Sequence, residues 1–144
     1  MNGGYADFDN FKTFEKYAAG RSQAIPYDKT VEVKSKKLNQ ALTVDGNSKW
    51  TVVKLPLGRI ALRSTDGKML SVQKTDNYNA KLVKTDKPDE TETFQWMELE
   101  GGDIVLMNIS SNCLLSYHGN GKAAARIKLP SANRNEDFVR FVIK

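Results

Sequence analysis

The sequence contains one cysteine and one histidine. A single cysteine excludes an internal disulfide framework, and one residue of each type excludes a zinc site built from several such ligands. A relay that needs two histidines is excluded as well. No apolar run approaches the roughly 18 residues that a membrane-spanning helix requires. The first residues lack the basic region and apolar stretch of a secretion signal.

The 144 residues are enough for one domain, with 40% hydrophobic and 27% charged side chains. This composition can fill a hydrophobic core and differs from that of a disordered chain. Lysine and arginine outnumber the acidic residues by 22 to 17, which gives a net charge of +5. Because the basic residues are spread among acids without interleaved aromatic rings, we expect a solvated surface with no nucleic-acid or membrane partner.

An internal repeat runs through the chain with a period of 44 residues. Its markers are three aromatic residues, and apolar residues recur in step after each of them. The three matching sets are Trp50, Val53 and Leu55; Phe94, Met97 and Leu99; and Phe138, Phe141 and Ile143. The period predicts that the three leading aromatic residues occupy equivalent positions inside one core.

Two details of the second repeat depart from this pattern. The spacing from Phe94 to Met97 and then Leu99 breaks strict alternation once, which predicts a β-bulge early in that strand. Trp96 stands where the repeat does not demand an aromatic ring, because Val52 occupies the matching position in the first repeat. We therefore expect Trp96 to pack at the periphery.

Each repeat has the pattern of several short β-strands joined by polar turns. The strands of the two full repeats are expected near Ile60, Leu70 and Leu82, and near Ile104, Leu115 and Ile127. The first repeat is abbreviated, because a short turn at residues 45–47 leads directly to Trp50 and replaces the whole third strand.

Three such repeats predict an all-β chain that folds as a β-trefoil with a pseudo-threefold repeat, a closed six-stranded barrel capped by hairpins. Closure removes exposed sheet edges, which explains how so many short strands can remain soluble. An open three-bladed propeller is the alternative, but it leaves little room for a central packing layer. We assign residues 27–144 to the trefoil and residues 1–26 to an N-terminal extension or remnant strand plus linker.

Residues 60–72, followed by the strand at Phe94, resemble the fascin-like trefoil repeat. In that repeat an apolar strand, an Asn/Asp-Gly-Lys turn and a leucine-containing strand recur, and residues 104–117 are a weaker version. The ricin-type lectin repeat fits less well, because its closing Gln-x-Trp signature is replaced by an adjacent Gln95 and Trp96. The resemblance implies a trefoil, and in fascin such domains bind actin.

Residues 3–11, Gly-Gly-Tyr-Ala-Asp-Phe-Asp-Asn-Phe, resemble the last strand of the accessory β-sandwich in glycosidases of family forty-three. This resemblance implies the C-terminal module of a larger secreted hydrolase, located outside the cell or in the periplasm, whose catalytic propeller is not in this chain. The alternative is an ordinary extension with Phe11, Phe14 and Tyr17 on one face of a short helix.

No catalytic constellation can be assembled from these residues. Cys113 lies beside leucines in an expected strand, where a cysteine is usually buried and inert. Asp89, Glu90 and Glu92 lie in a polar turn beside Pro88, where we expect solvated surface instead of the paired carboxylates of a glycosidase. We therefore predict a chain that is not an enzyme and that needs no cofactor or metal.

The loops between the second and third strands are the candidate binding sites. Sugars are bound by an aromatic face together with amide and carboxylate groups that bond to ring hydroxyls. The loop of repeat two carries all three types, and the alternative is an ordinary polar hairpin. Because repeat one lacks its third strand, we expect two sites at most. The candidate ligand-binding residues are Lys74, Asp76, Asn77, Tyr78 and Asn79 in repeat two, and Tyr117, His118, Asn120 and Lys122 in repeat three.

These observations predict a non-catalytic carbohydrate-binding module that holds an appended glycoside hydrolase near its polysaccharide by raising the effective substrate concentration. The expected partners are a polysaccharide or oligosaccharide and a catalytic domain of the same parent protein. Two alternatives stay open: a fascin-like module that binds proteins such as actin, and a purely structural accessory domain.

Overall fold

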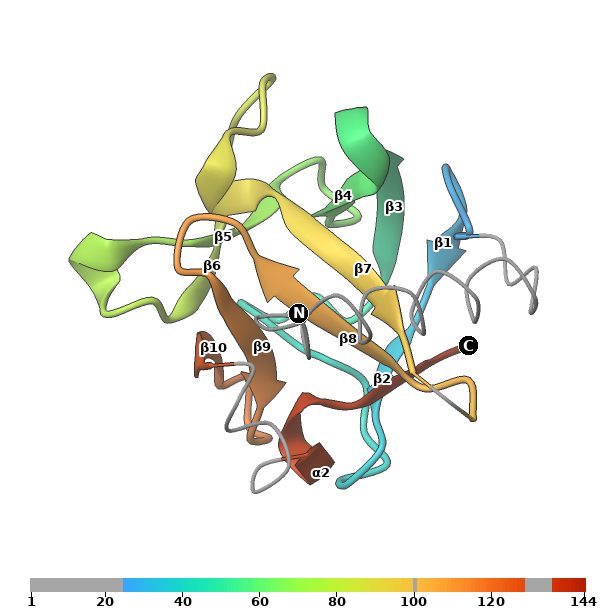
Figure 1. Cartoon of the computed structure of the whole chain (residues 1–144). Coiled ribbons are helices and arrows are strands. Elements are labelled where there is room, and N and C mark those ends of the chain that lie inside the picture. The colour runs from blue at the N-terminus through green and yellow to red at the C-terminus, as the bar shows by residue number, and fades with distance from the viewer. Residues whose placement is uncertain (1–24, 100, 129–135) are drawn as a thin grey trace, which may run out of the picture.

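The computed structural model describes residues 25–99, 101–128 and 136–144 (Figure 1). The predicted N-terminal extension therefore lies almost entirely outside the described residues. The eleven strands are β1 (Thr30–Val31), β2 (Val33–Ser35), β3 (Trp50–Lys54), β4 (Arg59–Arg63), β5 (Met69–Val72), β6 (Ala80–Val83), β7 (Phe94–Glu98), β8 (Ile104–Asn108), β9 (Cys113–Tyr117), β10 (Ala123–Ile127) and β11 (Phe141–Ile143). The short helical elements are η1 (Pro56–Gly58), η2 (Lys74–Asp76), η3 (Glu90–Glu92) and α2 (Glu136–Val139).

The barrel has the strand order β1-β3-β4-β7-β8-β11-β2, and every neighbouring pair is antiparallel. Only Glu32 separates β1 from β2, so the two segments follow one another as one interrupted barrel strand and close the ring. Figure 1 shows β7 and β8 running side by side across the front of this barrel. Closure leaves the barrel strands paired on both sides, which removes the edges at which chains aggregate.

The hairpins that cap the barrel distinguish the three repeats. In the second repeat β5 pairs with β6, with Leu70 opposite Leu82, and in the third repeat β9 pairs with β10. In the first repeat the corresponding region has isolated bridges, Lys34 with Ala41 and Val44 with Asn47, in place of a paired hairpin before β3 begins. The predicted β-trefoil with an abbreviated first repeat is thus confirmed.

Aromatic side chains at the first residue of alternate barrel strands fill the centre of the core. Trp50 begins β3, Phe94 begins β7 and Phe141 begins β11, and all three are fully buried. The prediction that Phe138 is the third member of this set is wrong. Phe138 lies on α2 and is half-buried, with its ring stacked on that of His118.

The physical reason is that one turn of helix precedes the last barrel strand. Phe138 and Val139 belong to α2, whereas Phe141 and Ile143 are two residues apart on β11 and therefore point to the same face. Helix α2 delays the strand by three residues, so the aromatic residue that fills the barrel follows Phe94 by 47 residues instead of 44.

The second repeat has no bulge in the strand where one was predicted. Strand β7 alternates without interruption, with Phe94, Trp96 and Glu98 buried, and its register with β8 does not shift. Trp96 is 9% exposed and belongs to the main core instead of the periphery. The irregular apolar spacing arises because Met97, on the outward face, packs into a second cluster. That cluster contains Val105, Leu114 and Val139, with Met97, Leu99, Met107 and Ile127 around it.

The finding that Phe141, and not Phe138, fills the barrel centre makes a prediction about stability. Phe141→Ala should lower the free energy of unfolding by about 3–5 kcal/mol, because it leaves a cavity at the barrel centre. Phe138→Ala should cost less than half as much, since its ring is partly solvated. Urea unfolding followed by the fluorescence of the buried Trp50 measures both values, and equal losses would contradict this assignment.

Candidate ligand-binding site

Two hairpins from different repeats meet across one pocket of about 420 Å³. Main-chain groups make part of the contact between them: Asn79 forms an isolated bridge with Ala124, and the Ala125 amide donates to the carbonyl oxygen of Tyr78 at 3.0 Å. The pocket therefore draws on both of the loops that the sequence singled out. Its lining residues are Asn79, Ala80, His118, Lys122, Ala123, Ala124 and Arg126.

Small side chains make the pocket hollow. Three of its lining residues are alanines, Ala80 on β6 and the adjacent Ala123 and Ala124 at the start of β10. A methyl group is the only side chain that each contributes, so the two hairpins can approach through their backbones while space remains between the longer side chains at the rim. The pocket thus has an apolar floor.

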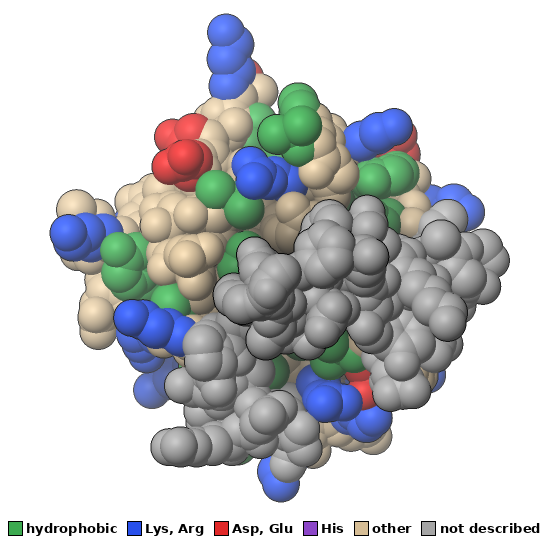
Figure 2. All heavy atoms as spheres, viewed as in Figure 1, with side chains coloured by type: hydrophobic (Ala, Val, Ile, Leu, Met, Phe, Trp, Pro, Cys, Tyr) green, Lys and Arg blue, Asp and Glu red, His purple; other side chains and the backbone are tan. Residues whose placement is uncertain are grey.

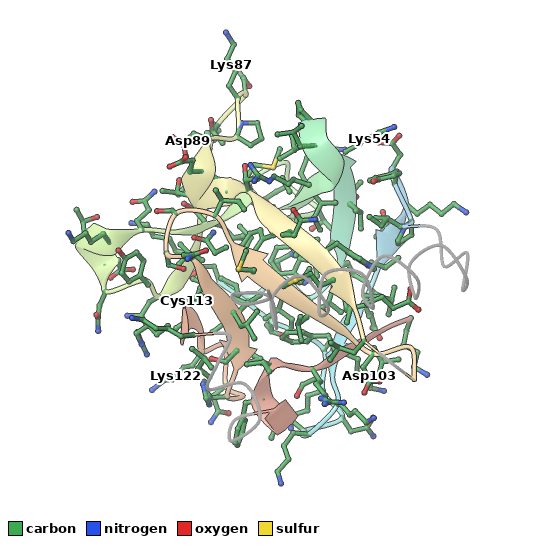
Figure 3. All side chains as sticks on the ribbon, in the orientation of Figure 1. Lys54, Lys87, Asp89, Asp103, Cys113 and Lys122 are labelled. Atoms are coloured by element: carbon green, nitrogen blue, oxygen red, sulfur yellow. The ribbon has the colours of Figure 1, made fainter. Side chains whose placement is uncertain are left out.

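The rim of the pocket is polar and basic. Asn79, Lys122 and His118 are exposed and come from the set predicted from the sequence, and Arg126 joins them. Of the described residues that line the pocket, none is acidic. Figure 2 shows that lysine and arginine side chains are otherwise scattered over the visible face, and Figure 3 shows Lys122 on the side of β9 and β10. A ligand in this pocket therefore meets donors and positive charge.

Arg126 was missed from the sequence, and its position depends on an irregularity in the β9–β10 hairpin. The register shifts between Ala125 and Ile127, so Arg126 lies at a bulge and is exposed. Its Nη1 atom donates to the Asn77 carbonyl oxygen at 2.7 Å and to Asn79 Oδ1 at 3.0 Å. The guanidinium thereby fixes the loop of repeat two against repeat three. A basic residue after a run of three alanines was the available signal.

The His118 ring is held from two sides. Its Nε2 atom lies 2.9 Å from Ser116 Oγ, and the ring stacks on Phe138 with centroids 5.0 Å apart and planes inclined by 30°. The Ser116 hydroxyl also lies 3.3 Å from the Ala124 carbonyl oxygen. Phe138, which is not part of the barrel core, thus supports a residue at the rim of the pocket.

The two tyrosines among the candidate residues are engaged in packing. Tyr117 is 2% exposed in the main core, and its hydroxyl oxygen accepts a hydrogen bond from the Gly121 amide at 3.3 Å. Tyr78 is half-buried against the same core, with a left-handed backbone conformation at φ 58°. Neither ring lines the pocket, so the aromatic face expected for a bound sugar is not supplied by a tyrosine.

The remaining candidates build the turns that present the pocket. Lys74 and Asp76 belong to η2 and are exposed, and neither lines the pocket. Asn77 at φ 53° and Asn120 at φ 52° adopt the left-handed conformation, which asparagine tolerates better than most residues. Their types are explained by turn geometry.

The acidic turn is a structural element. Glu92 is 4% exposed, so the expectation of solvated surface is wrong for this residue. Its carboxylate accepts hydrogen bonds from Ser71 Oγ at 2.6 Å and from the Asp89 amide at 3.1 Å, and Asp89 caps η3 in return.

Cys113 is buried, as predicted. The described residues contain no group of three or more potential metal ligands. The described part of the chain also has no helix with the length and apolar character of a membrane span.

The fold and the pocket define this chain as a β-trefoil protein with a candidate site between two of its hairpins. The solved structures similar to it include the designed threefold-symmetric protein ThreeFoil, at TM-score 0.63 and 15% identity over 79% of this chain and 96% of that one. They also include the BEL beta-trefoil in an apo crystal form, at TM-score 0.67 and 11% identity over 85% of this chain and 97% of that one. A mosquitocidal holotoxin matches at TM-score 0.67 and 14% identity over 83% of this chain and 17% of the toxin. At these identities the likeness establishes the fold alone. No protein-family model and no curated protein matches the sequence.

The capping turn predicts a pH-dependent contribution to stability. Hydrogen bonds from Thr91 hold the pKa of Asp89 below its ordinary value of 3.8. The resulting stabilisation is complete above that ordinary value and is lost as the pH falls through the lowered pKa of the folded state. Asp89→Ala should therefore cost about 1 kcal/mol at pH 7, as the loss of a helix cap does. Its deficit should shrink below pH 4. Urea unfolding across this range gives the difference, and a deficit independent of pH would count against the cap.

Proposed function

We propose that this chain is a non-catalytic carbohydrate-binding module whose sugar site is the pocket between the hairpins. The convergence of Asn79, Lys122 and Arg126 around an apolar floor carries this proposal. Amide, ammonium and guanidinium groups donate hydrogen bonds, and the hydroxyl and carboxylate oxygens of sugars accept them. The volume of about 420 Å³ suits one or two sugar rings, within the range of about 300–1,000 Å³ that small-ligand sites occupy.

The charge of the rim favours an acidic sugar. Lys122 and Arg126 contribute two cations, and none of the described lining residues opposes them with a carboxylate. Arg126 uses Nη1 to hold the neighbouring loop, and a guanidinium carries further N–H donors that can bond to a sugar carboxylate. The net charge of +5 adds a long-range attraction for an anionic polymer. The ligand class that fits is a uronate-bearing polysaccharide.

A binding module of this kind acts by keeping a catalytic domain near its polymer. The likeness of residues 3–11 to the accessory sandwich of family forty-three glycosidases supports a glycoside hydrolase as that partner, outside the cell or in the periplasm. Those residues lie outside the described part of the chain. The coding sequence upstream of Met1 tests this part of the proposal: an open frame that encodes a propeller supports it, and an in-frame stop contradicts it.

The fascin-like alternative rests on residues 60–72. In the structure Ile60, Ala61 and Leu62 on β4 are buried, as are all four residues of β5. The resemblance therefore lies in side chains that pack the trefoil interior, and such packing is compatible with many functions. A carbohydrate site is favoured because the polar, accessible side chains gather at the hairpin pocket. Cosedimentation with actin filaments discriminates the two proposals.

The binding site is tested by removing its two cations. Lys122→Gln with Arg126→Gln should weaken retention by polygalacturonate at least tenfold, since each charge-assisted hydrogen bond contributes about 1.5–3 kcal/mol. Affinity electrophoresis measures the retention, and neutral arabinoxylan should retain the parent chain less. Thermal unfolding of the variant checks that the hairpins still fold.

The matched control removes two positive charges elsewhere. Lys29 and Lys87 are exposed and do not line the pocket, and Figure 3 shows Lys87 at the tip of a distant loop. Lys29→Gln with Lys87→Gln should leave most of the retention intact. Equal weakening of both double variants would indicate attraction by net charge alone, and a parent chain that neither polymer retains would overturn the proposal.

A further inference from the structure

A second pocket, of about 360 Å³, lies beside the turn that joins β7 to β8. It shares no residue with the hairpin pocket, so a ligand bound there is independent of the proposed function. The described residues of its lining are apolar except for one carboxylate. The lining residues are Pro26, Trp96, Glu98, Gly102, Ile104, Val142 and Ile143.

Glu98 occupies an inward position of the barrel. It follows Phe94 and Trp96 at intervals of two on β7, and all three side chains are buried. Glu98 is 6% exposed, and its Oε2 atom is buried with no hydrogen-bond partner among the described residues. A buried carboxylate oxygen without a hydrogen-bond partner is costly, because it has lost its contacts with water and gains none from the described residues.

The basic side chains of Lys54, Lys36 and Arg140 contact groups other than Glu98. Lys54, at the matching position of the first repeat, is exposed and lies with its Nζ atom 5.2 Å from the centroid of the Tyr27 ring. Asp103 lies at the end of the β7–β8 turn. Its Oδ2 atom forms ion pairs with Lys36 Nζ at 2.6 Å and with Arg140 Nη1 at 3.6 Å. None of the described residues that line the pocket is a lysine or an arginine, so this part of the chain offers Glu98 no positively charged N–H donor there.

We propose that this pocket binds a small organic ammonium ion. Its nitrogen donates a charge-assisted hydrogen bond to the Glu98 carboxylate, and its apolar body packs against Ile104 and Ile143. Trp96 lines the same pocket, and an indole is the aromatic ring that attracts cations most strongly. An anion is repelled by Glu98, and a neutral alcohol leaves its charge uncompensated. The volume again falls within the range of small-ligand sites.

The experiment follows the two indole N–H signals of the full chain by NMR during titration with hexylammonium at pH 7. The Trp50 indole is fully buried and donates to the Leu42 carbonyl oxygen at 3.0 Å, so it serves as an internal reference. Hexylammonium should shift the Trp96 signal saturably and leave that of Trp50 in place. Hexanoate and hexanol, which have the same apolar stem, should bind at least tenfold more weakly.

Glu98→Gln removes the charge and keeps the shape of the side chain. The variant should lose the preference for hexylammonium over hexanol, and its melting temperature should equal or exceed that of the parent, because an unpartnered charge has been removed. The control Glu90→Gln makes the same charge change at an exposed position and should keep the parent's preference.

One further probe keeps the proposal testable if the Glu98→Gln variant fails to fold. Trimethylhexylammonium retains the positive charge but has no N–H donor, so it should bind the parent chain at least fivefold more weakly than hexylammonium. The proposal is overturned if hexylammonium, hexanoate and hexanol shift Trp96 equally, if none of them shifts it, or if Glu98→Gln retains the ammonium preference.

Discussion

The structure depends on closing a barrel of short strands around a centre that must be filled completely. Trp50, Phe94 and Phe141 meet this requirement from three repeats, and each is fully buried at the start of its strand. Trp50 brings one polar atom into this centre, and its indole N–H is satisfied by the Leu42 carbonyl oxygen at 3.0 Å. Because the barrel is packed and has no free edge, the hairpins outside it have a fixed base. The exposed side chains of the hairpins can therefore vary without loss of the barrel.

Much of this fold could be predicted from the sequence, because the repeat expresses the same packing requirement more than once. The position of β11, the last barrel strand, could not be predicted. The helical turn α2 delays this strand, and Phe138 and Phe141 are the same type of residue, so the sequence alone does not show which of them lies in the barrel. The supposed bulge at Phe94 failed for a related reason. Alternation along a strand identifies its buried face only when the other face is solvated, and Met97 packs outward into a second cluster. Both errors arose where apolar side chains serve a surface other than the barrel interior.

The candidate site was predictable only in part. Asn79, His118 and Lys122 were found because hairpin loops that bind ligands are rich in such residues, and loops are where function concentrates. Their convergence on one pocket could not be foreseen, because the hairpins meet partly through backbone groups that carry no sequence signal, and partly through the Arg126 side chain. Arg126 was missed because its orientation depends on a shift of register. The tyrosines were chosen for their aromatic rings, but Tyr117 is needed by the core.

Each of the two pockets contains a charged residue that the trefoil fold does not require. Similar barrels occur in sequences only 11–15% identical to this one, so the fold requires apolar volume and turn geometry and little else. Arg126 and Glu98 are required by neither. Arg126 lies at a shift of register in the β9–β10 ladder, and Glu98 occupies an inward position where an apolar side chain is the more stable choice. A residue whose type is unfavourable for packing is a better indicator of a binding site than a residue whose type is explained by the geometry of a turn. By this criterion the basic hairpin pocket and the carboxylate of the second pocket are two different candidate sites, because the ligand proposed for one has the charge that the other repels.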